Sequence, residues 1–395
     1  MCHNPQTREW WSLARQSAAQ LGVTEAAFWP SVSSQIGQSR VHSAERYQTQ
    51  QTASLTLSWL AFDFGGRDAA REQAQHLLWA AFANQDSGLQ TLFLTTLQAY
   101  YTAQASDAAV LAAEQSERAA KTSLDAAEQR YRVGTGTPLD RLQAQTALSQ
   151  ARLSRLRAEG EARVAQGSLA SLLGRSPARR IEIESPSVTG PDKAFAAGVE
   201  QLMADAQAKR PDLRAAEAKL AAASANVVQV GAQGKPTVTF SAGPHWQAVN
   251  GSDNPGGTLA FTVNLPVFTG FAHTYQKRLA EAQRDQQQAV RDRLVDQVAL
   301  DVWKAYQRLQ TATQTLSTTD DLLRSAEQAE RVALGRYQAG VGTVIDVLTA
   351  QSALANARLQ RIQAHLDWFV SRATLAQAMG ILGNGYWPGK VENIQ

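Results

Sequence analysis

Residues 130–145 read RYRVGTGTPLDRLQAQ, and residues 336–351 read RYQAGVGTVIDVLTAQ. The two stretches lie 206 residues apart. Three other pairs keep this offset: Pro5 with Pro211, Pro30 with Pro236, and Gly174 with Gly380. A constant offset indicates a duplicated fold, in which each half has the same elements in the same order. The period is far longer than the roughly 20–50 residues of solenoid repeats, so each half must hold several elements.

Composition excludes several classes of protein. The 395 residues carry a net charge of only +3, and both signs alternate along the chain, so no basic face for nucleic acid is predicted. One cysteine, Cys2, cannot form an intrachain disulfide. The sequence contains no run of 18 apolar residues, so no transmembrane helix is predicted. No signal peptide follows Met1, which predicts either a cytosolic protein or a trimmed mature chain.

The first half, residues 1–174, opens with a helix and two strands. The helix begins near Pro5 and ends before Pro30. Apolar and polar residues alternate from Leu55 to Ala61, which predicts a strand, and a more polar strand precedes it. The two strands fill residues 31–62, with a turn expected at 43–51.

Two long helices complete the first half, over residues 67–132 and 138–173, and the segment Gly134-Thr135-Gly136-Thr137-Pro138 separates them. Gly174 is the expected stop of the second helix. This helix carries a heptad stripe of Leu139, Leu142, Thr146, Ser149, Leu153, Leu156 and Gly160.

The second half, residues 206–382, repeats the pattern. We expect a helix from about Pro211, two strands within 237–265 joined by a loop at 250–257, and helices over 271–338 and 343–379. Residues 175–205, rich in Pro, Ser and Gly, predict a linker outside the helices, and 383–395 predict a peripheral tail. The fold class is therefore mainly α (α+β), with long antiparallel coiled-coil-like helices.

Helix lengths predict how the helices pair. At 1.5 Å per residue each long helix measures about 100 Å. Neither shorter helix of a half covers that length alone, so we expect the two to stack end to end beside it.

The strands raise a problem that one chain cannot solve. A four-stranded sheet with two open edges is unstable unless other copies close it. Three copies would supply twelve strands, an even-numbered barrel of membrane-spanning type. Aromatic residues at the strands fit either an interfacial girdle or a soluble core: Trp29, Trp59, Phe62, Phe64, Trp246, Phe261, Phe268 and Phe271.

The chain resembles the TolC-type outer-membrane efflux and secretion proteins. The resemblance rests on Asn4-Pro5, on the segments 62–67 and 265–270 after the strands, and above all on the doubled RYxxGxGTxxDxLxAQ. It covers nearly the whole chain. It implies a homotrimer, with a twelve-stranded β-barrel in outer-membrane lipid joined to a helical barrel that forms a periplasmic tunnel. It also implies docking through a periplasmic adaptor onto an inner-membrane transporter. The chain would thus be a passive exit duct for efflux or type I secretion in a Gram-negative bacterium.

A lipid anchor on Cys2 is one hypothesis, and a buried cysteine at the start of the first helix is the other. If the chain is an outer-membrane protein, the missing signal peptide indicates that it was trimmed.

The turn motif is the candidate gate. Asp140 and Asp346 lie in the first turn of a helix, where a carboxylate favourably meets the helix dipole. The resemblance adds a second role, because Asp346 matches an inward-facing acid at the periplasmic constriction, and three copies would form an acidic ring that attracts cations. Thr349 and Gly342 stand where the family prototype has a second acid and a locking arginine. The charged lock is therefore not expected here.

The remaining turn residues are candidates for tip packing, hydrogen bonding and adaptor docking: Arg130, Tyr131, Gly134, Gly136, Thr137, Arg336, Tyr337, Gly340, Gly342 and Thr343. No nucleophile motif, phosphate loop or metal-ligand spacing occurs among the six histidines, so neither an enzyme nor a cofactor is predicted. The alternative to a channel is a soluble helical scaffold with no transport role.

Overall fold

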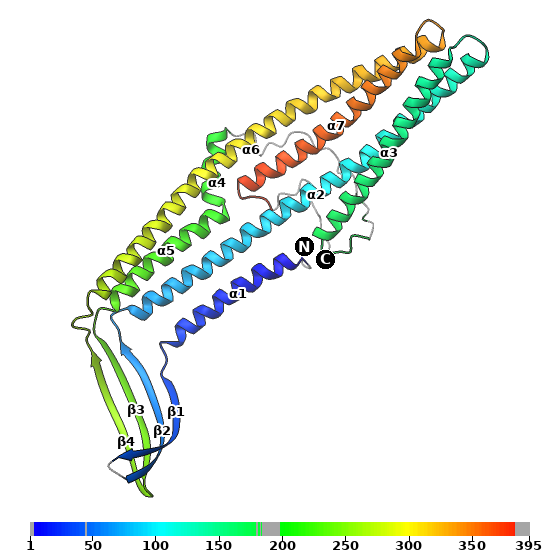
Figure 1. Cartoon of the computed structure of the whole chain (residues 1–395). Helices are drawn as coiled ribbons and strands as arrows, with labels where there is room; N and C mark the ends of the chain where they lie inside the picture. The colour runs from blue at the N-terminus through cyan, green and yellow to red at the C-terminus, as the bar shows by residue number, and fades with distance from the viewer. Residues whose placement is uncertain (1–3, 44–45, 179–180, 182, 184–197, 384–395) are drawn as a thin grey trace, which may run out of the picture. The chain divides into compact units, whose positions relative to one another are not determined.

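The computed structural model describes residues 4–43, 46–178, 181, 183 and 198–383 (Figure 1). The first half contains α1 (Pro5–Ala26), β1 (Ser31–Ser43), β2 (Arg46–Phe62), α2 (Gly66–Arg132) and α3 (Pro138–Leu172). After α4 (Val199–Lys209), the second half contains α5 (Pro211–Ala232), β3 (Thr237–Val249), β4 (Ser252–Asn264), α6 (Ala272–Gln338) and α7 (Val344–Ala378).

The structure confirms the two repeats. Helices α1, α2 and α3 begin and end 206 residues before α5, α6 and α7, and β1 stands in the same relation to β3. The difference lies in the second strand of each pair, since β2 has 17 residues and β4 has 13. The duplication therefore extends to the ends of the helices.

Helix α1 shows why these helices begin where they do. Pro5 opens it, and the Asn4 side chain accepts a hydrogen bond from the backbone N–H of Gln6 at 2.8 Å. The Asn4 amide also donates to the carbonyl oxygen of Leu172 at 3.0 Å. The first residues of α1 thus lie at the end of α3.

The four strands form one antiparallel sheet in the order β1-β2-β3-β4. The predicted turn at 43–51 and loop at 250–257 were both too long, because β2 already begins at Arg46 and β4 at Ser252. Asn250 and Gly251, with φ of 49° and 88°, make a two-residue turn. Backbone pairing continues through polar residues that show no apolar alternation, which is why the sequence pattern missed it.

The sheet has one apolar and one hydroxyl-rich face. Directly paired residues lie on the same side of a sheet. The pairs Trp59–Phe240 and Phe240–Phe261 thus belong to one face, with Leu57, Ala242 and Leu259 one step along it. The opposite face carries paired serines and threonines: Ser31–Ser58, Ser33–Thr56, Ser58–Ser241 and Thr239–Thr262.

The apolar face is uncovered in the single chain. Ile36 is 87% exposed, and Phe261 and Leu259 are each 72% exposed. Of the eight aromatic residues singled out at the strands, seven are exposed and Trp246 is partly buried. The alternative that these aromatics form a soluble core is therefore wrong for the single chain.

The chain divides into two compact units, each built from both repeats. Unit 2 consists of Glu9–Asp86 and Pro211–Val295 and holds the sheet, most of α1, α5 and the first parts of α2 and α6. Unit 1 consists of Met1–Arg8, Ser87–Arg210 and Asp296–Gln395. Most buried residues are alanines, which allow helices to approach closely.

Unit 1 contains two antiparallel helix hairpins. In the first, Arg155 and Gln166 of α3 reach Glu117 and Asp107 of α2. In the second, the Trp368 indole of α7 donates to the hydroxyl of Thr313 on α6 at 3.2 Å. None of the described helices is both long and apolar enough to cross a membrane.

The structure departs from the sequence expectation at α4 and along α3. The sequence did not predict helix α4, which extends across the expected end of the linker at residue 205. Leu202 and Ala206 of this helix are buried in unit 1. The Pro-, Ser- and Gly-rich sequence before α4 concealed it. The heptad stripe of α3 points outward, because the buried side chains are Ala144, Leu148, Ala162, Leu169 and Ala170. Cys2, most of 179–197 and the tail after Gly383 lie outside the described residues.

Gly243 offers a test of the sheet. A Cβ on this residue would lie 1.8 Å from the carbonyl oxygen of Leu55 on β2. Overpacking of this kind costs about 1–3 kcal/mol, so we expect Gly243→Ala to lower the urea midpoint of the protein purified in detergent. Gly257→Ala is the matched control, since the nearest atom to its added methyl group is 3.9 Å away. Equal midpoints for the two variants would contradict the register.

Candidate functional site at the helix-hairpin turns

The two turn segments have the same backbone conformation. Gly134 and Gly340 adopt φ of 78° and 80°, a left-handed conformation that glycine adopts without strain. The N–H of Thr135 donates to the carbonyl of Arg130 at 2.9 Å, and Val341 does the same to Arg336 at 3.0 Å. This is the hydrogen-bond pattern of a Schellman helix end, and it stops α2 and α6 sharply.

The second glycine of each turn is needed for a different reason. A Cβ on Gly136 would lie 3.0 Å from the backbone nitrogen of Tyr131, and one on Gly342 would lie 3.1 Å from Cβ of Arg336. Both contacts are tighter than ordinary van der Waals distances. The G-x-G spacing therefore combines a left-handed residue with a close approach of the chain to the helix that it leaves.

Threonine and aspartate start the helix that follows each turn. The backbone N–H of Thr137 donates to Asp140 at 3.0 Å, and the N–H of Asp140 donates to the Thr137 hydroxyl at 3.2 Å. Thr343 and Asp346 repeat the arrangement at 3.1 and 3.2 Å. These reciprocal bonds are capping boxes, so the helix-start role expected of both aspartates is present in the structure.

The second aspartate remains open to solvent. Asp346 and Thr349 are exposed, whereas Asp140 is partly buried. The hydrogen bond from the backbone of Thr343 holds the pKa of Asp346 below its usual value, and the Thr343 hydroxyl adds to the effect. Asp346 is therefore an exposed carboxylate at the turn that stays ionised at neutral pH.

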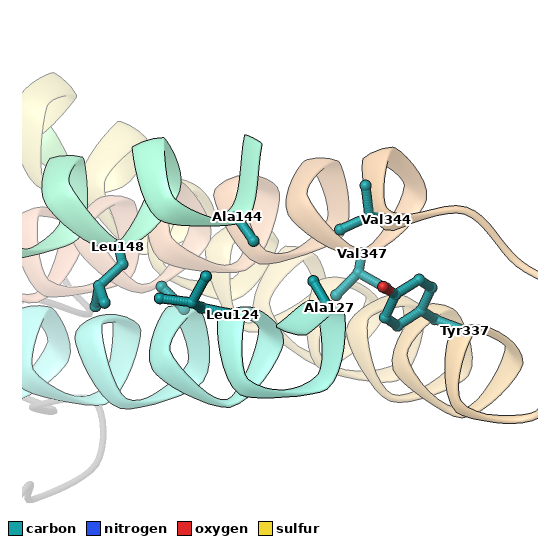
Figure 2. Close-up of a cluster of buried hydrophobic side chains, with 8 residues drawn as sticks. Leu124, Ala127, Ala144, Leu148, Tyr337, Val344 and Val347 are labelled. Atoms are coloured by element: carbon teal, nitrogen blue, oxygen red, sulfur yellow. The ribbon is translucent and has the colours of Figure 1, made fainter. Parts of the chain in front are cut away.

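The two hairpins pack against one another near their turns (Figure 2). Tyr337, Val344 and Val347 of the second hairpin point toward the first in Figure 2. They form one buried cluster with residues of α2 and α3: Ala120, Leu124, Ala127, Ala144 and Leu148. The turns of the two repeats are thus joined within one chain.

Arg130 stabilises this contact between the two hairpins. Arg130 donates to the backbone carbonyl of Tyr337 at 2.8 Å, and its guanidinium lies 4.8 Å from the centre of the Tyr337 ring. Burial raises the pKa of the Tyr337 hydroxyl, an effect that Arg130 opposes and that the nearby Asp140 carboxylate increases. Gly342 provides no charged lock, but a charged contact between the hairpins exists at Arg130.

The equivalent residues of the two repeats have different surroundings. Tyr337 is 3% exposed, whereas Tyr131 is 39% exposed and lies under the guanidinium of Arg141. Arg336, the counterpart of Arg130, is exposed. The sequence predicted that all four residues would pack at the turns, and it could not tell that one Arg–Tyr pair crosses between the hairpins.

A second polar contact joins the hairpins below the turns. The Gln351 amide donates to the hydroxyl of Ser123 at 3.0 Å and to the carbonyl of Ala119 at 3.3 Å. Gln351 is the last residue of the repeated motif and could have been singled out from the sequence. Ser123 is fully buried in α2 and carries no sequence signal.

Among the described residues, no group of three or more metal-ligating side chains comes together. The features of the turns are a backbone conformation shared by both repeats, the exposed carboxylate of Asp346, and the contact of Arg130 with Tyr337.

Comparison with known proteins identifies the architecture. The family model described as "Outer membrane efflux protein" matches residues 1–175 and 202–381. Protein CyaE of Bordetella pertussis is 32% identical over 399 residues, covering 97% of this chain and 82% of that protein. The chain belongs to the outer membrane efflux protein family. The pyoverdine export outer membrane protein OpmQ of Pseudomonas putida is 28% identical, covering 86% of this chain and 72% of OpmQ.

Solved structures show the same fold. VceC of Vibrio cholerae superposes with a TM-score of 0.84 at 23% identity, over 95% of this chain and 93% of that structure. CusC gives a TM-score of 0.85 at 21% identity, over 95% and 89% of the two chains. The chain is thus an efflux channel protein of the Gram-negative outer membrane and not an enzyme. The hypothesis of a helical scaffold without a transport role is wrong.

Arg130→Ala tests the contact between the hairpins. Losing a charged donor at a partly exposed site costs about 1 kcal/mol, so we expect hydrogen exchange of the amides around Tyr337 to rise roughly fivefold. Arg336→Ala removes the equivalent exposed arginine and is the control. If both variants exchange like the parent protein in this segment, Arg130 does not fasten the hairpins.

Proposed function

We propose that three copies of this chain close a twelve-stranded barrel in outer-membrane lipid, with β4 of one copy paired to β1 of the next. The observation that carries this proposal is the two-faced sheet. Within the chain, the described residues of β1 pair with β2 and those of β4 pair with β3, so each outer strand has one open edge. Strands β1 and β4 are also equally long, at 13 residues each.

The chemistry of the two faces fits this assembly. In a bilayer every backbone N–H and C=O must find a partner, which a closed barrel provides. The exposed apolar face, with Val32, Ile36, Leu259 and Phe261, suits lipid. The serine and threonine face would then line a polar lumen.

The outward stripe of α3 supports the same assembly in the helical part. Leu139, Leu142, Leu153 and Leu156 are 41–61% exposed in the single chain. Coverage of these leucines by a neighbouring copy would complete a helical barrel that continues the lumen as a tunnel.

The duct would move substrates passively from an inner-membrane transporter through a periplasmic adaptor to the exterior. The turns at 130–137 and 336–343 would dock the adaptor, and substrate choice, between efflux and type I secretion, would belong to the partners. Within this proposal residues 1–174 and 206–382 are the two repeats, 175–205 an equatorial linker and 383–395 a peripheral tail.

Disulfide trapping tests the barrel. Cysteines would replace Ser33 on β1 and, in separate variants, Thr258, Ala260 or Thr262 on β4, all in a Cys2→Ser background. We expect oxidation to link copies covalently up to the trimer in one of the three registers. Ser33→Cys with Thr56→Cys is the control, because these residues pair within one chain and should link without joining copies. No linked copies in any register would refute the proposed pairing.

We further propose that three Asp346 carboxylates form the constriction, with Asp140 behind them in the first turns. Asp346→Asn keeps a side-chain oxygen for the helix start but removes the charge, so it separates the two roles. We expect the variant channel to lose cation selectivity in planar bilayers, as should Asp346→Ala, whereas Thr349→Ala retains it. Unchanged reversal potentials for Asp346→Asn would remove Asp346 from the gate.

A further inference from the structure

In each helix hairpin of unit 1 an arginine pairs with a carboxylate on the neighbouring helix, and these two arginines, Arg155 and Arg361, are equivalent by the 206-residue offset. In the first hairpin Arg152 pairs with the same carboxylate, that of Glu117. Arg155 of α3 donates to Glu117 of α2 at 2.6 Å. Arg361 of α7 donates to Asp320 of α6, also at 2.6 Å. These bonds join the second helix of each hairpin to the first.

The residue one turn beyond each arginine differs between the repeats. In the first hairpin this residue is Glu159, whose carboxylate also pairs with Arg155. In the second hairpin the same position holds His365. Its Nε2 atom is buried and has no hydrogen-bond partner among the described residues. Arg155 therefore pairs with two carboxylates, whereas Arg361 pairs with one carboxylate and has an imidazole at the position one turn further along α7.

The surroundings of His365 favour its neutral form. Burial lowers the pKa of the imidazole, and the Arg361 guanidinium on the same helix lowers it further, whereas Asp320 on α6 opposes both. Arg361 and Asp320 are the charged groups that act on His365 within the described part of the chain. His365 is also the only histidine among the described residues of unit 1.

We propose that His365 makes the α6–α7 hairpin a pH-sensitive element: in mild acid the imidazolium repels Arg361, weakens the Arg361–Asp320 pair and loosens α7 from α6. The α2–α3 hairpin, with Glu159 in the same place, does not respond. The pH-sensitive contact is confined to this hairpin and does not depend on whether three Asp346 carboxylates form a constriction.

The direction of the effect follows from proton linkage. Because the folded-state pKa of His365 lies below the usual 6.5, the folded hairpin binds fewer protons than the opened one. The stability that His365 contributes is complete above pH 6.5. It falls as the pH drops below that value, until the folded-state pKa is passed.

Hydrogen exchange of the purified full-length protein at pH 7.5 and 5.5, corrected for intrinsic rates, tests the proposal. We expect the protection of amides around Arg361 to fall at pH 5.5. The fall has an upper limit of about tenfold, which would be reached if His365 bound a proton only in the opened hairpin. The segment around Arg155 in α3 is the internal control and should keep its protection.

Two variants make the test decisive. His365→Gln removes the titrating group, and His365→Glu reproduces the first repeat, so both should abolish the pH-dependent loss in α7. His365→Glu should also retain or raise protection at both pH values. The proposal is overturned if parent α7 shows no loss, if α3 loses protection equally, or if the loss persists in either variant.

Discussion

The unpaired edges of the sheet are the constraint on which the rest of the structure depends. Strands β1 and β4 each present a row of backbone N–H and C=O groups that one chain leaves open. One face beside those edges is apolar and exposed, and the other carries hydroxyl groups. In water such a sheet invites aggregation, whereas in lipid it is acceptable once the edges close. The fold therefore suits the assembly proposed above, in which neighbouring copies close both edges.

The helices meet this constraint with small residues. Alanines are the majority of the buried residues, so the long helices can lie close together without large interlocking side chains. The leucines of the α3 stripe are left on the outside. Both units therefore bury mostly small side chains inside the chain. Both also leave large apolar side chains exposed, which another copy or lipid can cover.

The sequence predicted the helices well because their ends are set locally. A proline, a left-handed glycine or a Thr-x-x-Asp box acts within a few residues, and each occurs twice at the same offset. The two turns between the strands were predicted too long because polar residues, such as Gln48 on β2 and Asn254 on β4, pair through their backbones without apolar alternation. The contact of Arg130 with Tyr337 could not be predicted, since the two residues lie 207 positions apart and their repeat counterparts look identical in sequence.

Duplication explains why those counterparts matter. Two identical hairpins in one chain would respond identically to any change in their surroundings. In this chain the two turns keep the same backbone conformation, and the two repeats differ in the surroundings or the identity of other side chains. Tyr337 is buried against Arg130 while Tyr131 is exposed, and His365 replaces the carboxylate of Glu159. The first hairpin is thus held by the carboxylates of Glu117 and Glu159, which both pair with Arg155. The second hairpin, which carries the exposed Asp346, depends on the first through Tyr337 and on the neutral form of one histidine. A chain built in this way can loosen one hairpin while the other keeps its place.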